Sequence, residues 1–370
     1  MNQPALLSPY KLRNVELENR IMVSPMGQYS CDETGCASDW QLVHLGGLAL
    51  SGAAIVMTEA TAVEPAGRVS NSDLGIWSDA QIAPLRRILD FARQHSRTRM
   101  GMQLAHSGRK GSVTKAWEGQ RPVATEDGGW DLWSASDTPH PGRVNPLALD
   151  REGLKRVRRA FAEGARRADA CGFDLVEIHG AHGYLLHSFL STFGNARTDE
   201  YGGSFENRIR FLVEVFDEVR EVWPSSKPVG IRISATDWAE GGWSLDDSIA
   251  LCKVLKARGC DYVTASSGGV TSEQKLVIHP GYQVPFAEAI KREAGLPVIA
   301  VGLITEPRQA EDIIQSGQAD MVALGRGMLF NPRWPWVAAV ELGGSVFYPR
   351  QYERAHPAMR RGDFLKPRES

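Results

Sequence analysis

Short apolar runs recur along the chain, each bounded by Gly, Pro or Asp and each followed by a longer segment with helical periodicity. This alternation is typical of repeated β–α units that form a parallel sheet. The pattern predicts eight strands, at residues 20–25, 53–60, 100–105, 174–180, 228–234, 261–267, 297–303 and 321–326.

Helical periodicity between these runs predicts helices that include 81–95, 153–171, 208–222, 245–258 and 306–316. Gly172, Gly259 and Gly317 follow three of these helices, where a left-handed residue commonly ends a helix. Eight alternating units predict a single (β/α)8 barrel over residues 1–345. An open doubly wound sheet is the alternative, but no G-x-G-x-x-G turn follows any predicted strand.

Two segments fall outside the repeat. Residues 6–17 resemble a short hairpin, which we expect to close the bottom of the barrel. Residues 107–150 are rich in Gly, Pro and Trp, and a loop of this length in a compact domain is usually functional or mobile. We interpret it as a lid over the barrel mouth; a surface elaboration without a substrate role is the alternative.

Composition excludes several classes of protein. The chain has 42% hydrophobic residues and a net charge of -2, which favours a globular protein and argues against nucleic-acid binding. Five cysteines without paired spacing suggest neither disulfides nor a zinc site. No export signal or membrane span is evident, so we expect a cytoplasmic protein without membrane contact.

The ends of the predicted strands indicate where a barrel enzyme would carry its site. Glycines follow strands seven and eight, at Gly302, Gly325 and Gly327, where backbone N–H groups could approach a phosphate. A phosphorylated cofactor is one interpretation; glycines that simply turn the chain are the other.

Arg232 lies among Val229, Ile231 and Ile233, where a permanent cation is costly unless an anionic or accepting group meets it. A reduced flavin would supply such a group, and the amide of Gln103 could donate to and accept from its pyrimidine edge. A structural ion pair with Glu177 is the alternative.

The His179, His182 and Tyr184 cluster ends the fourth strand. Two histidines at this spacing can bind a metal, be satisfied in a core, or donate hydrogen bonds to a substrate oxygen. Metal-dependent barrel hydrolases commonly begin with H-x-H on the first strand, which this chain lacks. Two donors on one carbonyl oxygen would stabilise the enolate of an enone, and the Tyr184 phenol could protonate the α carbon.

These residues resemble the Old Yellow Enzyme family of FMN-dependent ene-reductases, and most closely its thermophilic-like bacterial branch. The resemblance covers nearly the whole chain and rests on LRNV at 12–15, ENR at 18–20, QLAHSGRK at 103–110, HGAHGY at 179–184, RTDEYGGS at 197–204 and QYER at 351–354.

The resemblance implies a role for each residue of the site. His179 and His182 would bind the carbonyl oxygen, Tyr184 would donate the proton, and Tyr29 would be a further active-site residue. FMN would be held by Ser24, Pro25, Met26, Ala60, Gln103, Arg232, Gly302, Gly325 and Arg326.

The resemblance also implies the reaction and the assembly. Family members take hydride from NADPH or NADH and pass it from flavin N5 to the β carbon of an enone or enal. Arg354, in a C-terminal segment at 346–370, would reach the active site of a neighbouring subunit in a homodimer, or in a tetramer of paired dimers.

One residue departs from the branch, because Gly27 stands where relatives usually carry Cys. We expect a shifted flavin potential and a larger pocket near the ring, with ene-reductase activity retained. Oxidative demethylation or dienoyl-CoA reduction is a competing activity, but those larger relatives carry an iron–sulfur motif absent here. A flavin-binding protein without turnover is a further alternative, which the complete donor set disfavours.

Overall fold

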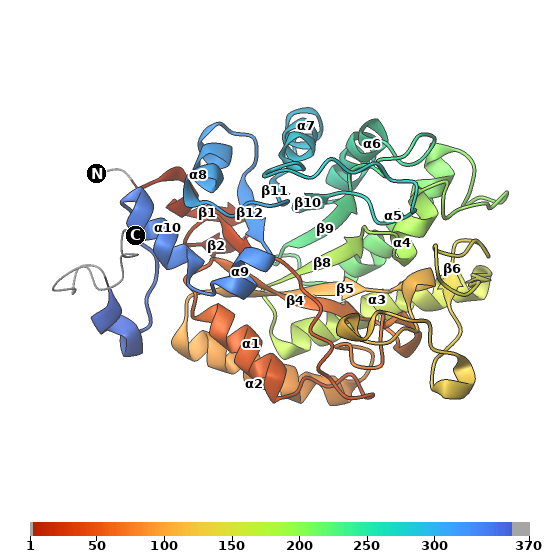
Figure 1. Ribbon diagram of the computed structural model, residues 1–370, viewed down its shortest axis with the longest axis horizontal. Coiled ribbons are helices and arrows are strands. Elements are labelled where there is room, and N and C mark those ends of the chain that lie inside the picture. The colour runs from red at the N-terminus through yellow and green to blue at the C-terminus, as the bar shows by residue number, and fades with distance from the viewer. Residues whose placement is uncertain (1–2, 357–370) are drawn as a thin grey trace.

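A computed structural model describes residues 3–356 of the 370-residue chain. Eight parallel strands close into a barrel in chain order, which confirms the predicted (β/α)8 fold (Figure 1). The barrel strands are β3 (Ile21–Val23), β4 (Ile55–Ala62), β5 (Arg99–Ala105), β8 (Leu175–Gly180), β9 (Val229–Ser234), β10 (Tyr262–Ser266), β11 (Val298–Ala300) and β12 (Met321–Leu324).

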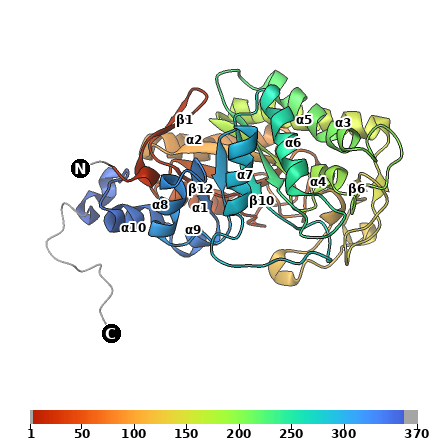
Figure 2. The same ribbon diagram turned by 90° about the horizontal axis from the view of Figure 1, so that it is seen from above.

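Helices surround this barrel in both views (Figures 1 and 2). The α-helices are α1 (Asp39–Ala49), α2 (Ile82–His95), α3 (Arg151–Cys171), α4 (Leu185–Leu190), α5 (Phe205–Val222), α6 (Leu245–Ala257), α7 (Val284–Ala294), α8 (Pro307–Gln315), α9 (Arg326–Phe330) and α10 (Trp334–Leu342). The 3-10 helices are η1 (Ala5–Leu7), η2 (Pro65–Gly67), η3 (Asp79–Gln81), η4 (Gly108–Lys110), η5 (Ala116–Glu118), η6 (Thr125–Asp127) and η7 (Arg350–Ala355).

The interior of the barrel is filled from one face of each strand, because alternate side chains of a strand point to the same side. Its lower part is an apolar cluster that includes Met22, Leu175 and Tyr262. The hairpin of β1 (Tyr10–Leu12) and β2 (Val15–Leu17) adds Leu12 and Leu17 to this cluster. The predicted hairpin therefore closes the barrel bottom.

Several predicted strands are shorter in the structure than in the sequence analysis. The seventh ends at Ala300, because Gly302 and Leu303 have φ values of 114° and 51° that no strand adopts. The eighth ends at Leu324, and α9 begins at Arg326. After each of these two strands, the chain turns at the barrel mouth.

The long segment at 107–150 lies at the right-hand end of the barrel in Figure 1, opposite the N-terminal hairpin. It contains three 3-10 helices and a small parallel pair, β6 (Trp133–Ser134) with β7 (Leu147–Ala148). The buried Arg109 guanidinium donates to the carbonyl oxygens of Thr138, Phe193 and Val270 at 2.9–3.1 Å. This side chain joins the long segment to two loops of the mouth.

Candidate active site at the barrel mouth

A polar layer lies above the apolar bottom of the barrel. Cross-strand register places Arg232 beside both His179 and Thr264, and Gln103 beside Glu177. The Glu177 carboxylate accepts from Gln103 Nε2 at 2.7 Å and from Thr264 Oγ1 at 2.5 Å. Gln103 is thereby oriented by a neighbouring strand, and its carbonyl oxygen stays available.

Arg232 forms no ion pair within 4.0 Å among the described residues, Glu177 included, and its buried Nε has no hydrogen-bond partner there. Burial lowers the pKa of Arg232, while the nearby Glu177 raises it. An orphaned buried N–H is costly, so this guanidinium fits an accepting group that occupies the adjoining cavity. The structural ion pair with Glu177 is not formed.

His179, His182 and Tyr184 come together at the end of β8. The His179 ring lies 5.2 Å from the His182 ring and 4.9 Å from the Tyr184 ring, each pair being nearly perpendicular. His179 Nδ1 accepts from Ala181 N at 3.2 Å, which leaves the ring proton on Nε2. His182 Nε2 lies 2.7 Å from Ser266 Oγ.

Burial keeps these three groups uncharged at neutral pH. Burial, reinforced by Arg232, lowers the pKa of both histidines well below the ordinary value. Burial also raises the pKa of Tyr184 above the ordinary value for a phenol. Two neutral imidazoles and a protonated phenol can donate hydrogen bonds without a competing charge.

Two adjoining cavities lie at the mouth, with volumes of about 280 and 170 Å³, and share Pro25 and Arg232. The first is lined by Ser24, Met26, Gly302, Gly325 and Arg326 as well, and the second by Ala60, Gln103, His179, His182 and Tyr184. All nine residues that the resemblance assigns to FMN thus line one continuous region. The glycine-lined end suits a phosphate, and Arg232 and Gln103 suit the polar edge of a flavin.

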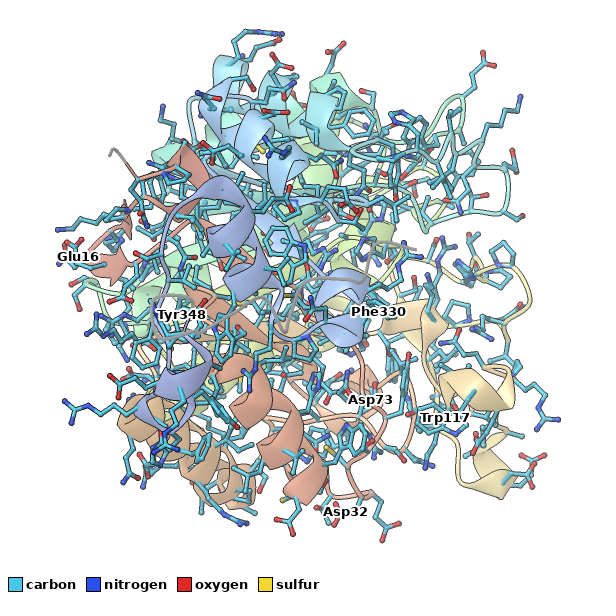
Figure 3. All side chains as sticks on the ribbon, turned by 60° about the vertical axis from the view of Figure 1, so that its left-hand side comes forward. Glu16, Asp32, Asp73, Trp117, Phe330 and Tyr348 are labelled. Carbon is cyan, nitrogen blue, oxygen red and sulfur yellow. The ribbon has the colours of Figure 1, made fainter. Side chains whose placement is uncertain are left out.

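Tyr29 connects the site to the long segment. Its hydroxyl accepts from Gln120 Nε2 at 3.4 Å, and its ring meets the edge of Trp117 with centroids 5.8 Å apart. Figure 3 labels Trp117 on this segment. These contacts favour the lid interpretation over a surface elaboration.

The pocket beside Gly27 is smaller than predicted from the sequence. A Cβ atom at this position would lie 3.3 Å from two ring atoms of Tyr29. The Tyr29 ring therefore borders the volume that a larger side chain would occupy, and a pocket enlarged by Gly27 is limited on that side.

Glu59 and Asp73 line the same cavity and were not assigned to the site from the sequence. The β4–β5 register shifts between Met57 and Ala60, and this irregularity brings Glu59 to the cavity. Its carboxyl group accepts from Gln28 N at 2.8 Å and Gln41 Nε2 at 3.3 Å. In the sequence, only the position of Glu59 near the end of a predicted strand indicates that it could reach the site.

Burial raises the pKa of Glu59 to about 8. The folded protein therefore favours the protonated carboxyl, and the resulting stability is lost as pH rises from about 4.5 towards 8. We expect Glu59→Gln to remove a decline of up to about 1.4 kcal/mol per pH unit in the free energy of unfolding across this window. Urea unfolding at several pH values measures it.

Glu64 contrasts with Glu59, because its pKa shift has the opposite sign. His106 and Arg156 outweigh burial and lower the pKa of Glu64 to about 2. Its contribution is complete above about pH 4.5 and is lost only as pH falls towards 2. A slope between pH 4.5 and 8 that is unchanged in Glu59→Gln would contradict the prediction.

Arg354 lies apart from this site. It is exposed on η7, at the end of Figure 1 opposite the long segment, and lines neither cavity at the mouth. Part of the predicted C-terminal segment, residues 357–370, lies outside the described residues.

Within residues 3–356, no group of three or more His, Cys, Asp and Glu side chains could hold a metal ion. Nor does any helix described there have the length and apolar character needed to cross a membrane.

The fold and site define a flavin-binding barrel, and comparisons with known proteins agree. Residues 5–342 match the NADH:flavin oxidoreductase / NADH oxidase family. An NADPH dehydrogenase of Geobacillus thermodenitrificans is 44% identical over 351 residues, which cover 94% of this chain and 98% of the relative. Another, from Listeria innocua, is 42% identical over 352 residues, or 95% and 98% of the two chains.

Solved structures give the same picture. Morphinone reductase superposes with a TM-score of 0.76 at 26% identity, over 97% of this chain and 93% of that one. A 2-naphthoyl-CoA reductase superposes with a TM-score of 0.82 at 24% identity, and the match covers 92% of this chain and 52% of that longer one; this likeness concerns the fold.

The chain belongs to the NADH:flavin oxidoreductase / NADH oxidase family. It is an FMN-dependent oxidoreductase of the Old Yellow Enzyme type that uses NAD(P)H, which confirms the predicted family, enzyme class and cofactors.

Proposed function

We propose that this enzyme reduces the C=C bond of α,β-unsaturated carbonyl compounds, that is, of enones and enals. The observation that carries the proposal is the convergence of two neutral imidazoles and one protonated phenol on the cavity beside Arg232. Bound FMN would supply the hydride that reaches the β carbon.

His179 and His182 are proposed to hold the substrate carbonyl oxygen. Donors placed in advance stabilise the negative charge that develops on this oxygen as the β carbon accepts hydride. Tyr184 is proposed to protonate the α carbon, since its phenol stays protonated in this buried place. The hydride would bring the electron pair of the new C–H bond at the β carbon. The electron pair of the C=C bond, held in the enolate, would form the C–H bond at the α carbon with the proton.

The lining of the two cavities supports a set of proposed cofactor contacts. Gly302, Gly325 and Arg326 are proposed to receive the phosphate, and Gln103 and Arg232 the pyrimidine edge of the ring. Ser24, Pro25, Met26 and Ala60 would complete the binding site. Tyr29 and Gly27 would contact the substrate, and residues 107–150 would cover it.

A single anaerobic experiment tests the function. We expect yellow protein that is bleached by NADPH or NADH and recovers its colour when 2-cyclohexenone is added in a stopped-flow instrument under nitrogen. Recovery must yield cyclohexanone, identified by gas chromatography. Bleaching without reoxidation by the enone would overturn the proposed substrate class, and colourless protein would contradict flavin binding.

Gly27→Cys tests the departure from related enzymes. The added side chain presses on the Tyr29 ring and brings a thiol into the same cavity. We expect a changed flavin midpoint potential and a changed KM for 2-cyclohexenone, with turnover retained. Gly27→Ala separates the two causes, because it adds the steric contact without sulfur. If potential and kinetics are the same in all three proteins, Gly27 has no special role.

We also propose that the enzyme is a homodimer in which Arg354 enters the partner's site. The proposal rests on the resemblance to the Old Yellow Enzyme family, and it agrees with the exposure of Arg354 on η7, away from the cavities of its own chain. Light scattering should give twice the chain mass, or four times for paired dimers. Mixing inactive Tyr184→Phe with Arg354→Ala under exchange conditions should restore activity in part, since some mixed sites contain both residues; no restoration contradicts the shared site.

A further inference from the structure

The turn that carries His182 and precedes Tyr184 has an unusual backbone. His182 and Gly183 both have positive φ values, 59° and 73°. Such a conformation is costly for a residue with a side chain and persists only where the surroundings hold it. A Cβ at Gly183 would lie 2.3 Å from the Gly269 carbonyl oxygen, so the turn is also packed tightly.

Three side chains hold the backbone of this turn. His182 N donates to Ser234 Oγ at 2.9 Å, and its carbonyl oxygen accepts from Lys110 Nζ at 2.8 Å. Gly183 N donates to Nδ1 of His187 at 2.8 Å. His187 lies on α4, which begins at Leu185 just after the turn, and its side chain is fully buried.

His187 is itself fixed by Asp237. Because Nδ1 accepts from Gly183, the ring proton lies on Nε2, which is 3.1 Å from Asp237 Oδ1. Neither atom forms a hydrogen bond of ordinary geometry among the described residues, so the N–H group and the carboxylate oxygen interact as a close electrostatic pair. Asp237 Oδ2 accepts from Trp243 N at 2.7 Å and from Ser191 Oγ at 2.6 Å.

These contacts demand a carboxylate at position 237. Both of its oxygens face donors whose protons are fixed, the Trp243 amide on one side and His187 Nε2 on the other. Burial would raise the pKa of Asp237, but His187 and the other donors outweigh it and hold the pKa below its ordinary value. An amide in this place would turn its NH₂ group towards one of the two donors.

We infer that His187 and Asp237 are positioning residues. Asp237 fixes the tautomer of the His187 imidazole, and this imidazole holds the turn at Gly183. That turn places the donor groups of His182 and Tyr184. The inference rests on the proposed function for the meaning of those donors. Neither residue lines the cavities at the mouth, so both act through the turn.

Four variants test this arrangement. His187→Asn places a carbonyl oxygen where Nδ1 lies and can still accept from Gly183 N, whereas His187→Leu cannot. Asp237→Asn keeps the size of the side chain, but its NH₂ group then faces another N–H donor. The His187 ring can avoid this clash by moving its proton from Nε2 to Nδ1, but that proton then faces the N–H of Gly183. Ser191→Ala is the matched control, because it removes a donor to Asp237 without forcing a new tautomer.

The readout is binding of 4-hydroxybenzaldehyde to the oxidised FMN-loaded enzyme, followed by the visible flavin spectrum. Its phenolate is an oxyanion that the two imidazoles would bind, and no turnover is needed. We expect Kd to rise about tenfold or more in His187→Leu and Asp237→Asn. In both variants the buried N–H of Gly183 loses its acceptor, and the turn that carries the donor groups changes conformation. Kd should stay within about threefold of wild type in His187→Asn and Ser191→Ala.

A purely structural role predicts a different result. Then His187→Asn, which leaves Asp237 without its partner, would lower Tm and raise Kd as much as His187→Leu does. Nitrogen-15 spectra of histidine-labelled protein add a direct check, because Asp237→Asn should move the His187 proton from Nε2 to Nδ1. Unchanged spectra and Kd in Asp237→Asn would overturn the inference. If wild-type enzyme binds the phenol but does not reduce 2-cyclohexenone, the proposed function fails while the positioning role stands.

Discussion

Tyr184→Phe is expected to lower the rate of enone reduction by about 10²–10⁴, the usual contribution of a positioned general acid. The phenol is the proton donor that the cavity presents beside the two histidines, and burial keeps it protonated. Removing the oxygen leaves the ring and its packing against His179 in place. Stopped-flow reoxidation of the reduced enzyme by 2-cyclohexenone measures the loss.

The first half of the cycle provides the internal control. Reduction of the flavin by NADPH does not require Tyr184 to protonate a substrate carbon, so the rate of bleaching should stay close to that of the wild type. FMN content and Tm should also be unchanged. A variant that reduces the enone at the wild-type rate would show that the α carbon takes its proton from another group or from water.

The barrel and the main donors could be predicted from the sequence because both depend on local patterns. Period-two alternation places Leu175, Glu177 and His179 on one face of β8, so that a residue near a strand end points into the mouth. Glycine stops such as Gly172, with φ 102°, mark helix ends in the same local way.

The supporting contacts could not be predicted, because they join residues far apart in the chain. His187 and Asp237 are separated by 50 positions, and neither stands at the end of a predicted strand. Arg109 donates to Val270 across 161 positions. Glu59 reaches the cavity through a register shift that no alternation pattern encodes. Close packing in three dimensions decides all three.

Arg232 shows where a local pattern leaves a real choice. A cation in an apolar strand predicted either an ion pair with Glu177 or an accepting ligand. The carboxylate of Glu177 is instead satisfied by Gln103 and Thr264, which leaves the guanidinium facing the cavity. The hydrogen bonds of its neighbours, not its own sequence context, therefore leave the guanidinium free to meet a ligand.

His179→Ala should lower the rate of enone reduction by about 10²–10³, as expected for loss of one oxyanion donor. Ala181 N fixes the imidazole with its proton on Nε2, and its lowered pKa keeps the ring neutral, so the donor is set before substrate arrives. The His179→Ala/His182→Ala double variant should lose less than the product of the two single effects, because both donors meet the same oxygen.

Ferricyanide separates this effect from damage to the flavin site. It takes electrons one at a time and offers no carbonyl oxygen to the imidazoles, so reduced His179→Ala enzyme should be reoxidised by it at the wild-type rate. Equal losses with ferricyanide and 2-cyclohexenone would mean that His179 supports the cofactor and not the substrate. A loss confined to the enone would indicate that His179 binds the carbonyl oxygen, because 2-cyclohexenone has such an oxygen and ferricyanide does not.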